Sequence, residues 1–293
     1  KHIISVCLSI GTLGEEIMAF SSVIDEVINN GTMVIIAAGN NGINPDKLNQ
    51  LALNKNAIVV GAINDKDQVT SYSNMGQEIG GGVIKPDLVA PGGSKLAQHR
   101  TIIGADGQSN QTTGAFGTSI SAALVSAATN VLVQAKWSNW SEWKNLNLTK
   151  WVKTIKSILL MTASETNLDR EEDPATSTSE SSYSPSLSNA PLSDGITDIH
   201  EGYGRMNLQA AVNALTQYMD VNKSTSGYLE SSINNPSGKH SFARRIILES
   251  NKTYLFNLTG ISNAEMDMFL FSNESNKYGE PISYDLWQNL HRL

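Results

Sequence analysis

Three short apolar segments near the start of the chain constrain its fold most strongly. They cover residues 3–10, 32–38 and 57–63, and each is rich in aliphatic side chains. Such runs are typical of strands buried on both faces, as in a parallel sheet covered by helices. Residues 15–30 lie between the first two segments and have one apolar helical face, formed by Ile17, Phe20, Ile24, Val27 and Ile28. This order predicts an α/β fold with a parallel sheet and helices on its faces.

A serine stands where a loop is expected to turn into a buried helix. Gly117-Thr118-Ser119 precedes residues 122–128, which are small and mostly apolar, as in a helix that passes through a domain centre. Backbone N–H groups in the first turn of a helix lack partners within it, so they can bind an anionic oxygen. Ser119 is therefore a candidate nucleophile whose attack generates an oxyanion. The alternative is an ordinary helix cap, since Thr and Ser are common in that role.

An asparagine follows the second apolar segment. Asn40 comes directly after Ala37-Ala38-Gly39, at the carboxyl end of the predicted strand. Open α/β sheets form their ligand crevice at this end, and the Asn40 amide could donate a hydrogen bond to a developing negative charge. The alternative is a simple turn, because Asn-Gly follows at once.

Four motifs in this order resemble those of the subtilisin-like serine proteases. They are Ala37-Ala38-Gly39-Asn40, Tyr72-Ser73-Asn74-Met75-Gly76, the Lys-Pro-Asp-x-x-Ala-Pro-Gly motif of residues 85–92, and Gly117-Thr118-Ser119-Ile120-Ser121. Residues 202–207, followed by an amphipathic helix, are similar to the end of the catalytic domain in that family. The resemblance covers about residues 3–218.

The resemblance implies a serine endopeptidase that forms an acyl-enzyme on Ser119 and holds the oxyanion with Asn40 and the Ser119 N–H. It also implies a primary specificity pocket, in which a polypeptide substrate lies as an added strand. One wall of that pocket would be Ser9, Ile10 and Gly11, and the other Ala37, Ala38 and Gly39. The family implies no organic cofactor and an extracellular or cell-surface location. Any structural calcium ion is not located by the sequence.

The acid and base that should activate the serine are missing from the expected positions. In this family the triad follows the order Asp, His, Ser, so both partners should precede Asn40. That stretch holds one histidine, His2, in an unrelated sequence context, and one aspartate, Asp25. Asp25 falls within the helix predicted over residues 15–30, off its apolar face, where we expect it to be exposed to solvent. We therefore predict that this chain alone is catalytically inactive.

Two explanations of this absence remain open. The chain can be a piece of a protease whose upstream part carries both residues, which the retention of Asn40 and Ser119 favours. Alternatively, it belongs to a non-catalytic relative that works in binding or adhesion through its C-terminal part. An α/β-hydrolase is a weaker alternative, because Ser121 stands where its nucleophile elbow needs a second glycine.

Composition restricts the partners and the organisation of the chain. A net charge of −7 over 293 residues disfavours nucleic acid, and no apolar run reaches the roughly 20 residues of a membrane span. The single Cys7 cannot form an intrachain disulfide, and the oligomeric state stays open.

We place the C-terminal part of a peptidase domain at 1–220, with a mobile insertion rich in Ser, Thr and Pro at 164–200. Beyond it, short β-like runs predict a small β-sandwich over 225–293, similar to a pre-peptidase C-terminal domain and expected to be incomplete. These runs are residues 241–249, 253–259 and 266–271.

Overall fold

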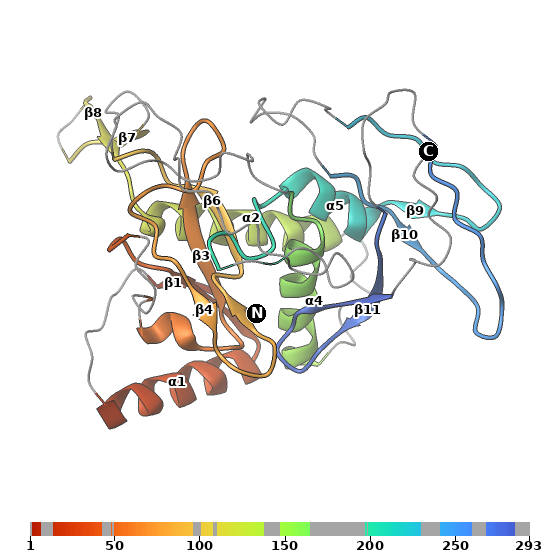
Figure 1. The fold of residues 1–293 in the computed structure, drawn as a ribbon, viewed down its shortest axis with the longest axis horizontal. Helices are drawn as coiled ribbons and strands as arrows, with labels where there is room; N and C mark the ends of the chain where they lie inside the picture. The colour runs from red at the N-terminus through yellow and green to blue at the C-terminus, as the bar shows by residue number, and fades with distance from the viewer. Residues whose placement is uncertain are drawn as a thin grey trace.

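A four-stranded parallel sheet forms the centre of the computed structural model (Figure 1). The strands lie in the order β1 (His2–Val6), β2 (Thr32–Ala37), β3 (Ile58–Ile63) and β6 (Leu88–Pro91). All three pairings between them are parallel, which confirms the predicted fold class. The structure describes residues 2–6, 14–42, 48, 50–95, 101–107, 110–137, 147–164, 197, 199–229, 241–259 and 268–284.

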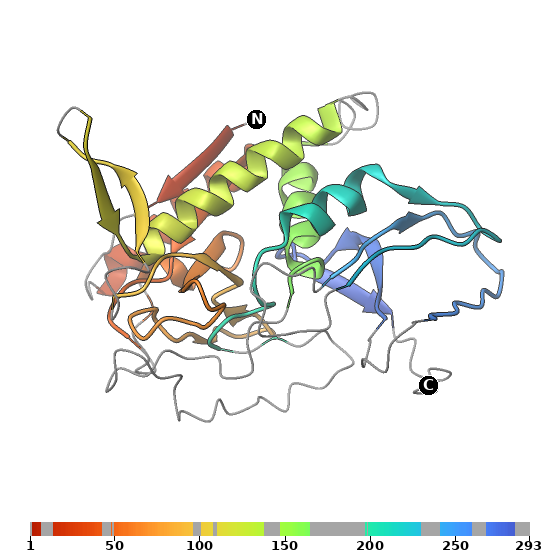
Figure 2. The ribbon, with the colours of Figure 1, turned by 90° about the horizontal axis from the view of Figure 1, so that it is seen from above.

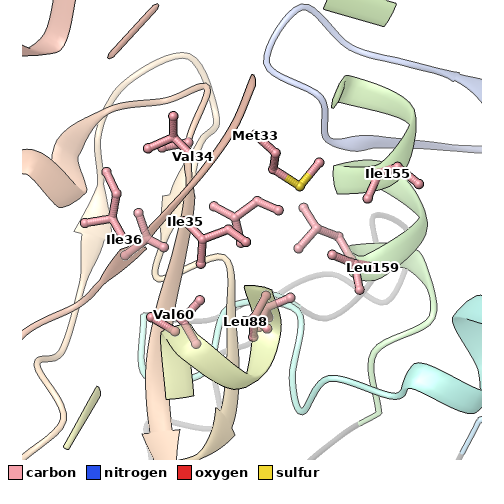
Figure 3. Packing of buried hydrophobic residues seen from close by; sticks show 14 of the residues in the cluster. Met33, Val34, Ile35, Ile36, Val60, Leu88, Ile155 and Leu159 are labelled. Atoms are coloured by element: carbon pink, nitrogen blue, oxygen red, sulfur yellow. The ribbon is translucent and has the colours of Figure 1, made fainter. Parts of the chain in front are cut away.

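The central strands are apolar throughout because both faces of the sheet are covered. Every residue of β3 is buried, and in β2 only the first residue, Thr32, is partly exposed. Side chains alternate along β2, so that Met33 and Ile35 point toward Ile155 and Leu159 of a neighbouring helix (Figure 3). Val34 and Ile36 point to the opposite side of the strand (Figure 3). The unbroken aliphatic runs of the sequence therefore correspond to strands buried on two sides.

The described helices that pack against the sheet are α1 (Gly14–Asn29), α2 (Thr118–Trp137) and α4 (Leu148–Met161), and α5 (Leu208–Thr216) packs against α2 and α4. The long helix α2 contacts all four strands, whereas α1 and α4 both contact β2 (Figures 1 and 2). Buried Trp151 of α4 fixes this arrangement further, because its indole N–H donates to the Gly31 carbonyl at 3.2 Å. The helix predicted over residues 15–30 and the amphipathic helix expected after residue 207 are confirmed as α1 and α5, with small shifts at their ends.

Helix α2 is long and apolar enough to meet the length and composition criteria of a membrane span over Thr118–Lys136. Core helices of water-soluble domains meet the same criteria, and α2 packs across the whole parallel sheet. This feature is therefore weak evidence for a membrane segment.

Shorter elements surround the sheet. They are the 3₁₀ helix η1 (Gln50–Leu53), the pair β4 (Gln77–Glu78) and β5 (Ile84–Lys85), and the hairpin of β7 (Ile102–Ala105) and β8 (Thr112–Ala115). The β7–β8 hairpin is largely exposed, projects from the fold (Figure 2), and leads directly into the loop before α2.

The C-terminal part contains two small strand pairs within the described residues. The parallel pair is β9 (Tyr218–Met219) with β10 (Arg245–Ile246), and the antiparallel pair is β11 (Leu270–Ser275) with β12 (Pro281–Tyr284). The strand predicted over 253–259 is wrong, because these residues have no strand pairing. A complete β-sandwich over 225–293 stays a prediction, as do the domain boundaries. Most of the predicted insertion at 164–200 lies outside the described residues.

Candidate active site

The structure brings the two predicted catalytic residues to the same edge of the sheet. Ser119 is the second residue of α2 and is half-buried, while Asn40 is exposed in the loop that follows β2. The start of α2 also contacts the end of β6, where the Gly117 N–H donates to the Gly92 carbonyl at 2.9 Å. The carboxyl ends of parallel strands thus carry the candidate site, as expected for an open α/β sheet.

Thr118 ties the asparagine loop to the serine helix. Its backbone N–H and its hydroxyl both donate to Asn40 Oδ1, each at 2.9 Å. The Thr118 hydroxyl in turn accepts a hydrogen bond from the Gly39 N–H at 3.2 Å. These contacts hold the carbonyl end of the Asn40 amide, so the orientation of the whole amide is fixed.

The donor end of the same amide is available. Among the residues that the structure describes, no group accepts a hydrogen bond from Asn40 Nδ2. A Cβ atom built on Gly117 would lie 3.4 Å from Nδ2, so this nitrogen faces the loop just before the serine. The side chain can therefore donate to an oxygen bound beside Ser119.

The loop after β2 is braced by Asn74, a residue to which the sequence analysis assigned no role. Asn74 Nδ2 donates to the Ala38 carbonyl at 3.1 Å, and Asn74 Oδ1 accepts from the Asn41 N–H at 2.6 Å. Gly39 has a φ of +113°, and a Cβ there would lie only 2.2 Å from Asn74 Nδ2. The conformation next to Asn40 thus requires glycine. The Tyr-Ser-Asn motif was the sequence signal for this brace.

Tyr72 and Ser121 anchor the start of α2 to the end of β6. The Tyr72 hydroxyl lies within hydrogen-bonding distance of the Gly92 and Gly93 carbonyls, at 2.8 and 2.7 Å, and accepts from the Gly117 N–H at 3.1 Å. Ser121 is fully buried and donates to the Ala90 carbonyl at 2.9 Å. Ser121 is therefore a structural residue, whereas Ser119 is the accessible serine of the motif.

The predicted pocket walls are only partly described. Ala37 and Ala38 are buried at the end of β2, and Gly39 is half-buried beside Asn40. The other wall, Ser9, Ile10 and Gly11, lies outside the described residues. The assignment of both walls to a substrate pocket stays a prediction.

Two candidates for the acid and the base, Asp25 and His200, have described side chains. Asp25 is half-buried in α1, where its Oδ1 accepts from the side-chain amides of Asn54 and Asn56, both at 2.8 Å. The expectation that Asp25 is exposed to solvent was wrong. His200, the one histidine with a described side chain, is buried two residues before Gly202, whose backbone packs against Pro86 and Asp87 at the amino end of β6.

A search of the described residues finds no group of three His, Cys, Asp or Glu side chains that could hold a metal ion. The arrangement around Ser119 accordingly consists of a serine at a helix start, an oriented amide donor and a braced strand-end loop.

Comparisons with known proteins identify the same family. A family model described as the subtilase family matches residues 2–204. The chain is 34% identical over 85 residues to subtilisin-like protease 2 of Pseudogymnoascus destructans, a match that covers 29% of this chain and 19% of that protein.

Among solved structures, the prenylagaramide maturation protease PagA is 21% identical, with a TM-score of 0.49, over 73% of this chain and 61% of that one. Proteases from Pseudoalteromonas arctica are 22% identical, with a TM-score of 0.49, over 73% of this chain and 51% of theirs. The chain thus spans only part of each of these relatives.

Proposed function

Because the chain belongs to the subtilase family, we propose that it is the serine-bearing part of a serine endopeptidase acting on polypeptides. In this proposal Ser119 Oγ attacks the scissile carbonyl and forms an acyl-enzyme, which water then hydrolyses. The proton of the hydroxyl passes to a histidine that lies outside this chain. The chain alone is therefore inactive.

The orientation of Asn40 carries the proposal. Its carbonyl oxygen is held by two hydrogen bonds from Thr118, which leaves Nδ2 as a fixed donor beside the serine loop. Donors that are oriented before the reaction stabilise the developing oxyanion without reorganising. The first-turn position of Ser119 adds a backbone N–H from the start of α2. A helix cap without catalytic function would not need this amide to be oriented.

The substrate is proposed to bind against the loop after β2. Ala37, Ala38 and Gly39 form one wall of the pocket for the side chain before the scissile bond, and Ser9, Ile10 and Gly11 form the other. An extracellular or cell-surface location and polypeptide substrates are consistent with the family.

The proposal is tested with the protein encoded by the complete gene, compared with this chain alone. We expect hydrolysis of unfolded casein by the former and none by the latter, with Ser119→Ala abolishing the activity. Asn40→Ala should lower kcat by about 10²- to 10³-fold with little change in KM, because the lost donor acts mainly in the transition state.

Asn41→Ala is the matched control, since Asn41 bonds to Asn74 through its backbone N–H rather than its side chain. We expect this variant to keep nearly full activity. Hydrolysis by the chain alone that disappears in Ser119→Ala would refute the need for an outside base. Equal kcat in Asn40→Ala and Asn41→Ala would refute the assigned role of Asn40.

A further inference from the structure

A cluster of charged side chains is buried at the amino end of β6, at the opposite end of this strand from the candidate active site. Lys85 and Asp87 are fully buried, and Lys156 of α4 is nearly so. Asp87 Oδ2 pairs with Lys85 and accepts from the Val59 N–H, while Asp87 Oδ1 lies 3.1 Å from Lys156 Nζ. Both ammonium groups also donate to the Ala57 carbonyl.

The charges of these three side chains do not balance. Two lysines share one carboxylate, so the cluster retains one positive charge when all three groups are ionised. Burial of an uncompensated charge is unfavourable. Burial lowers the pKa of Lys85 to about 7, with Lys156 lowering it further and Asp87 and Glu280 opposing the change. A second carboxylate in the vicinity would compensate the cluster.

The hairpin of β11 and β12 brings this carboxylate. Both strands of this hairpin contact α4, and Figure 1 shows β11 beside that helix. The turn between the strands, residues 276–280, also lies against α4. Gly279 has a φ of +83°, and a Cβ atom built on it would lie 3.2 Å from Lys156 Cδ. The next residue, Glu280, is buried, and its Oε2 accepts from Asn276 Nδ2 at 2.8 Å. The turn thus closes over the Lys156 side of the cluster.

Neighbouring contacts hold the same turn in place. Lys55 Nζ lies over the Tyr278 ring, 5.2 Å from its centroid. The Lys55 carbonyl accepts a hydrogen bond from Lys156 Nζ at 2.9 Å. An exposed ion pair at 2.8 Å joins Glu274 of β11 to Lys150 of α4. Both the charged cluster and the adjacent loop therefore contact the hairpin.

We propose that the β11–β12 hairpin is an intramolecular clamp on the peptidase fold, in which Glu280 compensates the buried Lys85–Asp87–Lys156 cluster. The surface formed by α4 and Lys55 is the docking surface, and its partner is this chain's own C-terminal hairpin. A peptidase unit that ends near residue 220 would lack this carboxylate. The charged groups that shift the pKa of Lys85 are Asp87, Lys156 and Glu280, and these determine how the attachment depends on pH.

The sign of this dependence follows from the charges. Below about pH 7 Lys85 is protonated, and Glu280 brings the four-residue cluster to neutrality. Well above that pH Lys85 is neutral, so Lys156 and Asp87 already balance without Glu280. Glu280 should therefore stabilise the protein at low pH and contribute little at high pH.

The test compares Glu280→Gln with Glu274→Gln in the full 293-residue chain, by urea unfolding at about pH 6 and about pH 9. The glutamine at 280 can still accept a hydrogen bond from Asn276, so the variant removes mainly the charge. We expect Glu280→Gln to raise the unfolding equilibrium constant by about tenfold or more at the lower pH, the equivalent of about one pKa unit, and by much less at the higher pH. Glu274→Gln should change it by less than about twofold at either pH, as expected for an exposed ion pair.

Equal changes of the unfolding equilibrium constant in the two variants would overturn the proposal. A loss of stability in Glu280→Gln that is the same at both pH values would also overturn it. If Glu280→Gln folds poorly, its combination with Lys85→Met is decisive. Removal of one cation should then restore folding, whereas a merely steric role of Glu280 predicts no rescue. The measurement does not depend on peptidase activity.

Discussion

Replacement of Lys85 by methionine tests how a buried charge couples folding to pH. The Lys85 ammonium is fully buried at the start of β6, and burial lowers its pKa from 10.5 to about 7. In the unfolded chain the same group is hydrated and keeps its ordinary pKa. Between these two pH values the unfolded state therefore binds more protons than the folded state.

The sign and size of the effect follow from this difference. For a lysine whose pKa is lowered by folding, stability rises as pH increases from about 7 to 10.5 and is flat below this window. Each pKa unit corresponds to about 1.4 kcal/mol, so the free energy of unfolding should rise by about 5 kcal/mol across the window, as an upper bound. Lys85→Met removes the titrating group while its unbranched side chain fills similar space.

The assay is urea unfolding of both proteins at several pH values from about 6 to about 10. The two proteins differ only at position 85, so the difference between the two curves isolates the contribution of Lys85. We expect the wild-type curve to rise more steeply with pH than that of Lys85→Met, and the two to be parallel below about pH 6. Parallel curves over the entire range would refute the lowered pKa and the charge argument for the cluster.

Two further changes test the packing around the sheet. Gly92→Ala should destabilise the protein by about 1–3 kcal/mol, because a Cβ there would lie 2.6 Å from both Ser121 Oγ and Ala62 Cβ. Urea unfolding measures this loss of stability. Gly104→Ala is the control, because a Cβ at Gly104 meets open space. A similar loss of stability in both variants would contradict the crowding assigned to Gly92. Asp25→Ala should cost about 1–3 kcal/mol by the same assay, because the buried Asn54 amide loses an acceptor, and an unchanged midpoint would show that this network is not stabilising.

The sheet and its helices were predictable because their signals are local. β2 and β3 are continuous aliphatic runs, and the helix with Ser119 begins at the predicted Gly-Thr-Ser sequence. The strand predicted over 253–259 was wrong because local residue types do not determine whether a segment finds a partner strand. Its aromatic and aliphatic residues favour a strand, yet Leu255 is 87% exposed and the segment pairs with no strand in the part of the chain that the structure describes.

The supporting contacts of the site were not predictable from one sequence. The Asn74 brace joins positions more than thirty residues apart and uses backbone groups of the loop after β2. Helical periodicity predicted that Asp25 is a surface residue. Its partners, the side-chain amides of Asn54 and Asn56, belong to a loop whose position beside α1 cannot be read from that periodicity. In both cases the partner is chosen by tertiary structure, which hydrophobic periodicity does not encode.

The motif of residues 85–92 connects the buried charged cluster to the start of α2. The segment from Lys85 to Gly92 begins with the buried charges at one end of β6 and ends with the glycine that receives the start of α2 at the other. The strand between them is buried except at Pro91 and pairs with β3 in the parallel sheet. The motif therefore contributes to the fold in two separate ways, through ion pairing at Lys85 and through close packing of Gly92 against Ser121. Variants at the two ends of the motif should therefore have different effects. Those at Lys85 should change the pH dependence of stability, and those at Gly92 should change the packing at the start of α2.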